Sequence, residues 1–263
     1  MTATDLTGRV VLVTGGAQGL GEGMARALAA AGARVMIADV NEAGADTAAS
    51  LGEGHGFVRL DVTDDAGWEA ATAACVDQLG GLDVLVNNAG IEISSLITEV
   101  QVEDIRKMLD VNILGTTLGL KHGLRTMRPG GGAGKGGSII NISSVAATIA
   151  FPAISVYSGT KSAVDRLTRV AAMESGKLGY GVRVNCIYPG LVPTAMGAGL
   201  ANDMAALGLY GSPEEAVGAV IELTPSGRLG EVEDMADAVV FLASDQSRFI
   251  NGAGIPVDGG MGM

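Results

Sequence analysis

The sequence predicts an α/β fold in which a doubly wound parallel sheet has helices on both faces. Strand-like apolar runs alternate with helix-length segments along most of the 263 residues, and this alternation is typical of a parallel sheet with crossover helices. Residues 10–13 and 84–86 are purely apolar, as in strands that are buried on both faces. A composition of 48% hydrophobic and 17% charged residues suits one globular domain with an ample core.

The expected elements follow one another in a regular order. Strands are expected at residues 9–14, 34–39, 56–60, 83–87, 138–142 and 182–187. Helices are expected at residues 19–31, where Gly32 ends an Ala- and Leu-rich run, and at 42–51, 66–79, 102–127 and 155–178. In such a sheet, ligands bind at the carboxyl ends of the strands.

Two segments depart from this alternation. Residues 129–137 are mostly glycine and are expected to form a loop, because so much glycine prevents regular structure. Residues 195–230 are rich in Met, Leu, Ala and Gly and show no strand pattern. No break in composition marks a second domain, so residues 1–263 are expected to form a single one.

Charge and composition exclude several classes of function. A net charge of -12 argues against nucleic acid or an anionic membrane as partner. With two histidines and with Cys75 and Cys186 far apart, no metal site is expected. No apolar run approaches the roughly 18 residues that span a bilayer, and residues 1–9 lack the features of a signal peptide. A cytoplasmic location is expected.

A glycine cluster follows the first strand and opens the first helix, in Thr14-Gly15-Gly16-Ala17-Gln18-Gly19-Leu20-Gly21. Glycine permits a tight turn and close backbone approach, and the free N–H groups of a helix start can hold a pyrophosphate. An ordinary strand–helix turn would have the same composition. Its position after the N-terminal strand favours the interpretation as a dinucleotide-binding loop.

Asp39 ends the second strand roughly 20 residues after this loop, where a carboxylate can accept hydrogen bonds from the adenosine ribose. The same charge repels a 2′-phosphate, and Gln18 offers no cation in its place, so NAD is favoured over NADP. Asp39 is also a candidate helix N-cap. Asp61, at the end of the third strand, is expected either to approach the adenine or to cap a helix.

Tyr157 and Lys161 stand four residues apart on one face of a predicted helix. A phenol is a poor base at neutral pH, and a neighbouring cation favours the phenolate. The pair is therefore a candidate acid/base, although a solvated helix face would show the same spacing.

The chain resembles the short-chain dehydrogenase/reductase family over essentially its whole length. The matching residues are Thr14-Gly15-x-x-x-Gly19-x-Gly21, Asn87-Asn88-Ala89-Gly90, Asn112, Ser144 followed thirteen residues later by Tyr157-x-x-x-Lys161, and Pro189-Gly190. Within the family it is most similar to NAD-dependent hydroxysteroid and cyclic-alcohol dehydrogenases. The resemblance implies a Rossmann-like sheet of about seven strands, with the last strand at residues 255–260, and a homotetramer.

The resemblance also implies four catalytic residues. Ser144 would hydrogen-bond the substrate oxygen, and a loop-capping hydroxyl is expected of Ser143 instead. Tyr157 would exchange the alcohol proton as hydride moves between substrate and nicotinamide. Lys161 would lower the Tyr157 pKa and hold the nicotinamide ribose. Asn112, placed in the middle of a helix, would position a water in a proton relay.

The NAD contacts that the resemblance implies come from the loops after each strand. They are Gly15, Gln18, Gly19, Leu20, Gly21, Asp39, Val40, Asp61, Val62, Asn88, Ala89, Gly90, Val111, Tyr157, Lys161, Pro189, Gly190, Val192 and Thr194.

Residues 195–230 would then form a small helical lid over the substrate. The expected substrate contacts are Ser144, Val145, Ala146, Phe151, Tyr157, Met196, Met204 and Leu207, with Leu209, Tyr210, Glu92, Ile93, Ala147 and Pro152 as further candidates. This flexible apolar surface suits a bulky or cyclic, steroid-like substrate, although such residues serve equally as plain core.

The function that the resemblance implies is an NAD-dependent oxidoreductase (EC 1.1.1.-) that interconverts a secondary alcohol and its ketone. One alternative is a 3-oxoacyl thioester reductase, which Asp39 disfavours because that class normally uses NADPH. Enoyl reduction is disfavoured because those relatives space Tyr and Lys further apart. A non-catalytic dinucleotide-binding protein is the third alternative, although all four expected catalytic residues are present.

Overall fold

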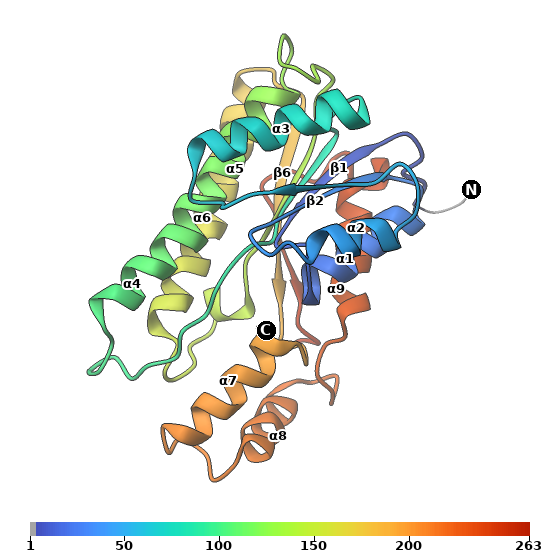
Figure 1. The fold of residues 1–263 in the computed structure, drawn as a ribbon. Coiled ribbons are helices and arrows are strands. Elements are labelled where there is room, and N and C mark those ends of the chain that lie inside the picture. Colours follow the sequence, from blue (N-terminus) through green and yellow to red (C-terminus); the bar gives the residue numbers. More distant parts are fainter. Residues whose placement is uncertain (1–3) are drawn as a thin grey trace.

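The computed structural model describes residues 4–263, so residues 1–3 of the stretch in which no signal peptide was expected lie outside it. Within the described residues, a seven-stranded sheet has the order β3-β2-β1-β4-β5-β6-β7, and every pairing is parallel. The doubly wound fold that the sequence predicts is confirmed (Figure 1). The strands are β1 (Val10–Thr14), β2 (Arg34–Asp39), β3 (Gly56–Arg59), β4 (Val84–Asn87), β5 (Gly137–Ile142), β6 (Val182–Pro189) and β7 (Gly254–Val257).

Helices occupy the connections between these strands. They are α1 (Gly19–Ala30), α2 (Gly44–Ser50), α3 (Asp65–Leu79), α4 (Val102–Met108), α5 (Gly115–Met127), α6 (Ser155–Lys177), α7 (Ala195–Ala206), α8 (Pro213–Leu223) and α9 (Val232–Ala243), with a π-helix η1 (Leu109–Leu114) and the 3-10 turns η2 (Val145–Ala147) and η3 (Asp245–Ser247).

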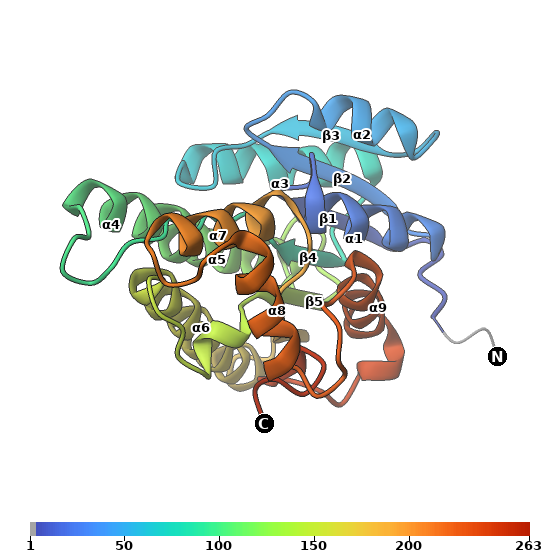
Figure 2. The same ribbon diagram turned by 90° about the horizontal axis from the view of Figure 1, so that it is seen from below.

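Alternating side chains of the central strand build a core on each face of the sheet. Val11 and Val13 pack in one cluster with α1 and α9. Val10 and Leu12 pack in the other cluster with α3, α5 and α6. Figure 2, which looks at the molecule from below, shows these helix layers on opposite sides of the strands. Because β1 is buried on both faces, its apolar run has no polar alternation.

The chain reverses direction across the sheet at β1, which pairs with β2 on one side and with β4 on the other. The loops that leave these neighbouring strands diverge, and a crevice opens between them at the carboxyl edge. This topology explains why polar residues that are far apart in the sequence, but lie at the carboxyl ends of the strands, come together at this crevice.

The helix expected at residues 102–127 is interrupted in the structure. Its helical path is continuous, but Leu109–Leu114 form a π-helix between α4 and α5. Asn112 lies in this segment, and its side chain is bonded to Ile91 and Thr160 rather than to its own helix. A π segment widens the helix locally, and here it coincides with the buried amide.

Several boundaries also differ from those expected by one to three residues, and three of the differences have a clear physical cause. The second helix begins at Gly44 rather than at residue 42, because the Asn41 side chain accepts the N–H of Ala43 in a turn. Gly137 belongs to β5 rather than to the preceding loop; a Cβ there would collide with the carbonyl oxygen of Asp83. The last strand ends at Val257, because Asp258 accepts the N–H groups of Gly260 and Gly262 and turns the chain.

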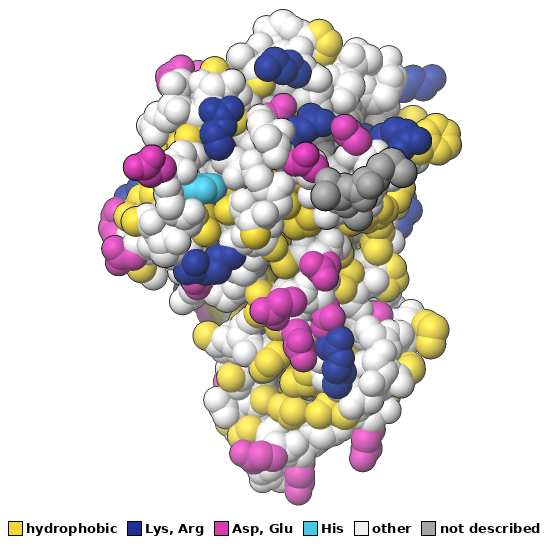
Figure 3. Space-filling model, turned by 90° about the vertical axis from the view of Figure 1, so that its right-hand side faces the viewer, with side chains coloured by type: hydrophobic (Ala, Val, Ile, Leu, Met, Phe, Trp, Pro, Cys, Tyr) yellow, Lys and Arg dark blue, Asp and Glu magenta, His cyan; other side chains and the backbone are white. Residues whose placement is uncertain are grey.

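Residues 195–230 contain α7 and α8 and form a small lobe beyond the carboxyl edge of the sheet (Figure 1). The helical character predicted for this segment is confirmed. Acidic side chains gather where this lobe joins the main body in the side view of Figure 3. Across residues 4–263, no helix combines the length and the apolar character that crossing a membrane would demand.

Candidate functional site

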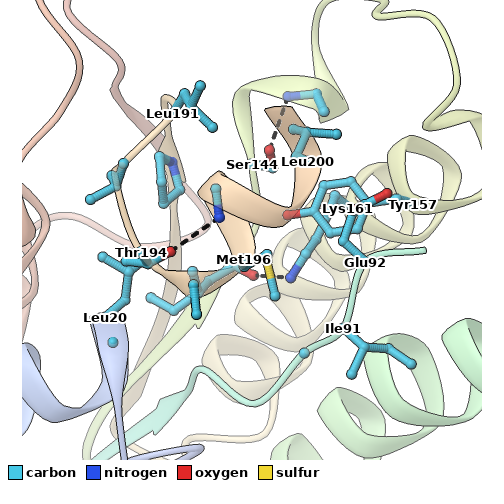
Figure 4. Close-up of a pocket in the computed structure, with 18 of the residues that line it drawn as sticks. Leu20, Ile91, Glu92, Ser144, Tyr157, Lys161, Leu191, Thr194, Met196 and Leu200 are labelled. Atoms are coloured by element: carbon cyan, nitrogen blue, oxygen red, sulfur yellow. Dashed lines mark hydrogen bonds between the residues drawn. The ribbon is translucent and has the colours of Figure 1, made fainter. Parts of the chain in front are cut away.

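A cavity of about 620 Å³ follows the carboxyl edge of the sheet from the glycine-rich loop to α7. Its walls come from the segments that follow β1, β2, β3, β4, β5 and β6, and from the α7–α8 lobe. Part of it is shown in Figure 4. Every residue expected to contact NAD lines this cavity: Gly15, Gln18, Gly19, Leu20, Gly21, Asp39, Val40, Asp61, Val62, Asn88, Ala89, Gly90, Val111, Tyr157, Lys161, Pro189, Gly190, Val192 and Thr194.

The glycine-rich loop has the conformation and the close packing that explain its composition. Gly15 and Gly19 have φ of 64° and 60°, in the left-handed region that glycine adopts without strain. A Cβ at Gly21 would collide with the carbonyl oxygen of Gly15. The start of α1 therefore lies directly against the loop, and a helix start in the wall of a cavity has free N–H groups that can stabilise a phosphate.

The end of β4 holds this loop in place. The Asn88 amide donates to the carbonyl oxygens of Thr14 (2.9 Å) and Gly15 (3.1 Å). The Thr14 hydroxyl oxygen accepts the N–H groups of Asn88 and Ala89, each at 3.1 Å. One strand further along, Asn87 donates to Asn141 at 2.8 Å. The amides of Asn87 and Asn88 thus brace neighbouring strands.

Asp39 is anchored at the edge of the cavity by two backbone donors. Its Oδ2 accepts the N–H of Ala17 (3.0 Å) and its Oδ1 accepts the N–H of Asn41 (2.9 Å). The residue before α2 is Ala43, so Asp39 is not a helix N-cap. Arg59 stands opposite Asp39 in the β2–β3 register, but it pairs with Glu42 at 3.3 Å and does not line the cavity.

Asp61 likewise does not cap a helix. Its Oδ1 accepts the N–H (2.9 Å) and the hydroxyl (2.7 Å) of Thr63, whereas α3 is capped by Asp64. Asp61 and Val62 line the cavity where the third strand ends.

The capping hydroxyl after β5 belongs to Ser144 and not to Ser143. Ser144 caps η2 and accepts the N–H of Ala146 at 3.1 Å, whereas Ser143 donates to the carbonyl oxygen of Lys161 at 2.8 Å. The expectation that Ser143 would be the capping hydroxyl is therefore wrong. By accepting a bond from Ala146, the Ser144 oxygen keeps its own proton available for an acceptor in the cavity.

Tyr157 and Lys161 lie on α6 and face the cavity together, as their spacing predicts (Figure 4). Lys161 Nζ lies 5.5 Å from the centroid of the Tyr157 ring and donates to the carbonyl oxygen of Ile142 at 2.9 Å. This bond holds the ammonium at the end of β5, between the phenol and the end of β4.

Burial dominates the electrostatics of this pair. It raises the pKa of Tyr157 to about 12; a hydrogen bond from Ser144 opposes the rise and the charge of Glu92 adds to it. Burial also lowers the pKa of Lys161 to about 8. The net shift of the Tyr157 pKa is therefore upward rather than downward, because the cost of removing the phenol from water outweighs the contact that favours the phenolate.

Asn112 lies behind the cavity and not in its wall. Its side chain is buried, accepts the N–H of Ile91 (2.9 Å), and donates to the carbonyl oxygen of Ile91 (2.9 Å) and to the Thr160 hydroxyl (3.0 Å). A Cβ at Gly90 would lie 3.3 Å from both Asn112 Oδ1 and Lys161 Nζ. The amide thus fixes the segment after β4 against α6, next to the buried ammonium.

The segment after β6 closes the cavity opposite the glycine-rich loop. Gly190 donates to the carbonyl oxygen of Val257 at 3.0 Å, and Val192 is buried in the core shared with α1 and α9. Thr194 caps α7 by accepting the N–H of Gly197 at 3.3 Å. A Cβ at Gly19 would lie 3.9 Å from Thr194, so the start of α7 faces the start of α1.

The expected substrate contacts divide into two groups. Ser144, Val145, Ala146, Phe151, Tyr157, Met196 and Met204 line the cavity, as do Glu92, Pro152 and Tyr210. Leu207 does not: it follows the end of α7 and packs in a small cluster with Leu96 and Phe151. Ile93, Ala147 and Leu209 are also outside the lining.

Several lining residues were not expected from the sequence. They are Leu60, Ile91, Lys107, Ile142, Ser143, Ile154, Leu191, Ala195, Gly197, Leu200, Ala201, Ala216, Val220 and Met261. Six of them directly neighbour an expected residue along the chain, so a wider window around each motif would have included Leu60, Ile91, Ser143, Leu191, Ala195 and Gly197. Lys107 stands one helical turn before Val111, a spacing that could have identified it. Nothing in the sequence places Met261 beside residues 145–216.

Among the residues that the structure describes, no group of three or more His, Cys, Asp and Glu side chains is arranged to hold a metal ion.

Comparison with known proteins gives a consistent family assignment. A family model described as enoyl-(acyl carrier protein) reductase matches residues 15–262. The trans-4-hydroxycyclohexanecarboxylate dehydrogenase of Sinomonas cyclohexanicum is 38% identical, over 96% of this chain and 92% of that protein. The 3-beta-hydroxysteroid dehydrogenase of Comamonas testosteroni is 39% identical, over 98% of both chains.

A solved structure supports the same assignment. A gluconate 5-dehydrogenase from Burkholderia cenocepacia J2315, in complex with NADP and tartrate, superposes with a TM-score of 0.87 and 33% identity, over 98% of this chain and 96% of that one. These relatives agree with the seven-stranded parallel sheet described above, and the family to which they belong binds a nicotinamide dinucleotide.

The burial of Lys161 predicts a specific dependence of stability on pH. The Lys161 pKa is lowered from 10.5 to about 8 in the folded protein, so the unfolded chain binds more protons between these values and stability rises with pH across that window. We expect the free energy of unfolding of Lys161→Met, relative to that of the wild type, to be highest at and below pH 8. This relative advantage should shrink by ~3 kcal/mol as pH rises to 10.5.

Urea unfolding of both proteins at several pH values from 7 to 10.5 measures this difference. Lys135→Met, at an exposed position in the loop of residues 129–136 before β5, is the matched control. Its free energy of unfolding relative to the wild type should not change with pH. A Lys161→Met difference that stays constant from pH 8 to 10.5 would contradict the burial of a titrating ammonium.

Proposed function

The chain belongs to the short-chain dehydrogenase/reductase family, and from this premise we propose that it is an NAD-dependent oxidoreductase that interconverts a secondary alcohol and its ketone, with Tyr157 as the acid/base. The observation that carries the proposal is the meeting of Ser144, Tyr157 and Lys161 in the same cavity as the glycine-rich loop. This meeting supports the proposal, because the three side chains line the cavity that would hold the dinucleotide although they come from segments that are separated in the sequence.

Ser144 and Tyr157 define the place of the substrate oxygen. The Ser144 hydroxyl accepts the Ala146 N–H and lowers the pKa of Tyr157, and both hydroxyls line the same cavity, one from the start of η2 and the other from α6. In oxidation, Tyr157 takes the proton of the alcohol as the carbinol carbon loses hydride; in reduction it returns the proton. When bound, the dinucleotide supplies the hydride acceptor or donor.

Lys161 and Asn112 support this proton exchange from behind. A buried ammonium beside the phenol stabilises the charge that forms on Tyr157 when it gives up its proton, and this stabilisation grows as water is excluded. Asn112 holds the segment after β4 next to Lys161 through its two bonds to Ile91. We assign Asn112 the role of ordering a water that connects Lys161 to solvent.

The preference for NAD rests on Asp39. Its carboxylate is fixed by Ala17 and Asn41 and lines the cavity at the end of β2, which β1 and β4 separate from β5. In this position it accepts hydrogen bonds from ribose hydroxyls and repels a 2′-phosphate. Arg59, the cation opposite in register, is paired with Glu42.

The substrate end of the cavity favours a bulky or cyclic apolar alcohol. Phe151, Met196, Leu200, Met204 and Tyr210 line it, and the methionines adapt to irregular shapes. The relatives named as dehydrogenases of a hydroxysteroid and of a hydroxycyclohexane derivative support this class of substrate.

A homotetramer in the cytoplasm completes the proposal. Apolar side chains on the outer helical surfaces support self-association, because exposed groups of this kind mark contact surfaces. They are Leu109, Leu114, Val170 and Met173, which are between 40% and 65% exposed in the single chain.

Replacing the Tyr157 hydroxyl tests the acid/base assignment. Tyr157→Phe should lower kcat for cyclohexanol oxidation by about 10²–10⁴-fold, because a positioned proton acceptor contributes on this scale. Binding of NADH, followed by its fluorescence, should persist because the glycine-rich loop is untouched. Tyr180→Phe, outside the cavity, is the matched control and should retain turnover. Full activity of Tyr157→Phe would refute the assignment.

Removing the charge of Asp39 tests the cofactor preference. The wild type should prefer NAD over NADP by at least about tenfold in kcat/KM, because juxtaposed like charges are costly. Asp39→Asn keeps an acceptor for Ala17 and should narrow this ratio, whereas Asp77→Asn, exposed on α3, should leave it unchanged. A wild-type preference for NADP would overturn the argument.

A further inference from the structure

A carboxyl group stands at the substrate end of the cavity. Glu92 lies on the segment that follows β4 and lines the cavity with Phe151, Met196, Leu200 and Met204, which are all apolar. The other two carboxylates in the lining, Asp39 and Asp61, end β2 and β3. Glu92 is therefore the acidic side chain that a substrate in the apolar part of the cavity meets.

The carboxyl of Glu92 is oriented but incompletely satisfied. Within residues 4–263, the Ser94 hydroxyl is its only protein donor, bonding Oε1 at 2.9 Å. A carboxylate offers about four acceptor positions, so Oε2 in particular is left for a ligand or for water. Burial raises the pKa of this carboxyl, which reflects the cost of holding its charge away from bulk water.

Glu92 is close enough to the reacting groups to act on the same substrate. Its charge contributes to the raised pKa of Tyr157, and Figure 4 shows Glu92 beside Tyr157 and Lys161. The side chain comes from the end of β4, whereas Ser144 and Tyr157 come from the segment after β5 and from α6. When Ser144 and Tyr157 hold the substrate oxygen, the rest of the substrate therefore lies within reach of the Glu92 carboxyl.

A second carboxylate reinforces the sign of the charge. Asp203 on α7 is exposed and does not line the cavity, yet its charge also raises the pKa of Glu92. Asp203 on the lid and Glu92 in the cavity wall therefore both contribute negative charge at the substrate end. An anionic substituent would be repelled here, whereas a hydrogen-bond donor would be stabilised.

We propose that Glu92 is a specificity-determining residue that selects secondary alcohols carrying a second hydrogen-bond donor, a hydroxyl or an ammonium, and that it rejects alcohols carrying a carboxylate. This inference rests on the proposed alcohol dehydrogenase function. An alcohol with no second polar group leaves the Glu92 carboxyl dehydrated and unpaired, which costs binding energy. A second donor restores the missing hydrogen bond.

The test compares four alcohols that differ at one position of the same ring: cyclohexanol, trans-1,4-cyclohexanediol, trans-4-aminocyclohexanol and trans-4-hydroxycyclohexanecarboxylate. The wild type should oxidise the diol and the amino alcohol with kcat/KM at least about tenfold above that of cyclohexanol, as expected for a hydrogen bond to a charged group. The carboxylate should fall about tenfold or more below cyclohexanol. Ratios to cyclohexanol cancel any loss common to all substrates.

Two variants separate charge from hydrogen bonding. Glu92→Leu should abolish the advantage of both donors and the penalty on the carboxylate. Glu92→Gln retains an acceptor oxygen without the charge, so it should keep most of the advantage of the diol, lose that of the amino alcohol and remove the penalty. Glu53→Gln, exposed in the turn after α2, is the matched control and should reproduce the wild-type ratios.

The outcomes distinguish this inference from the function on which it rests. If Glu92 only held its loop through Ser94, all four substrates would change together, and ratios within about twofold of wild type in Glu92→Leu would overturn the inference alone. A wild type that prefers the carboxylate would also overturn it. If the wild type oxidised none of the four alcohols, the proposed function would fail, and the inference with it.

Discussion

The hydrogen bond from Lys161 to the carbonyl oxygen of Ile142 joins the two elements on which the site depends. It fastens α6 to the end of β5, and Ser143 adds a second tie by donating to the carbonyl oxygen of Lys161. These contacts set the position of Tyr157 relative to Ser144. Tyr157 lies one helical turn before Lys161 on α6, and Ser144 directly follows Ser143 after β5. Catalytic geometry thus arises from packing a helix against a strand end.

The same contacts explain the electrostatics of the cavity. An ammonium that is withdrawn from water and held by one carbonyl has a lowered pKa, and a phenol beside it has a raised one. Both groups therefore favour their neutral forms more than they do in water, and in the proposed proton exchange the developing charge would lie at this buried position. The carboxyl of Glu92 lies in the same cavity, and the proposed selectivity for a second hydrogen-bond donor follows from it.

Most of the fold and much of the site could be predicted from the sequence, because strand ends of a parallel sheet converge at one edge. Asp39 was located by its place at the end of a strand, and Ser144 by its spacing from Tyr157 in the motif shared with the family. Features that depend on tertiary contacts could not be predicted. The π-helix at Asn112 follows from bonds to Ile91 and Thr160, and Met261 reaches the cavity only because the chain turns after β7.

Hydride transfer from the carbinol carbon is the step that the whole arrangement serves. Cyclohexanol carrying deuterium at that carbon, incubated with the protein and NAD, provides a direct measurement by mass spectrometry of the reduced dinucleotide. The account predicts that each reduced dinucleotide carries one deuterium and that an equal amount of cyclohexanone forms. A ketone formed without deuterium in the dinucleotide, or no ketone from any secondary alcohol, would contradict it.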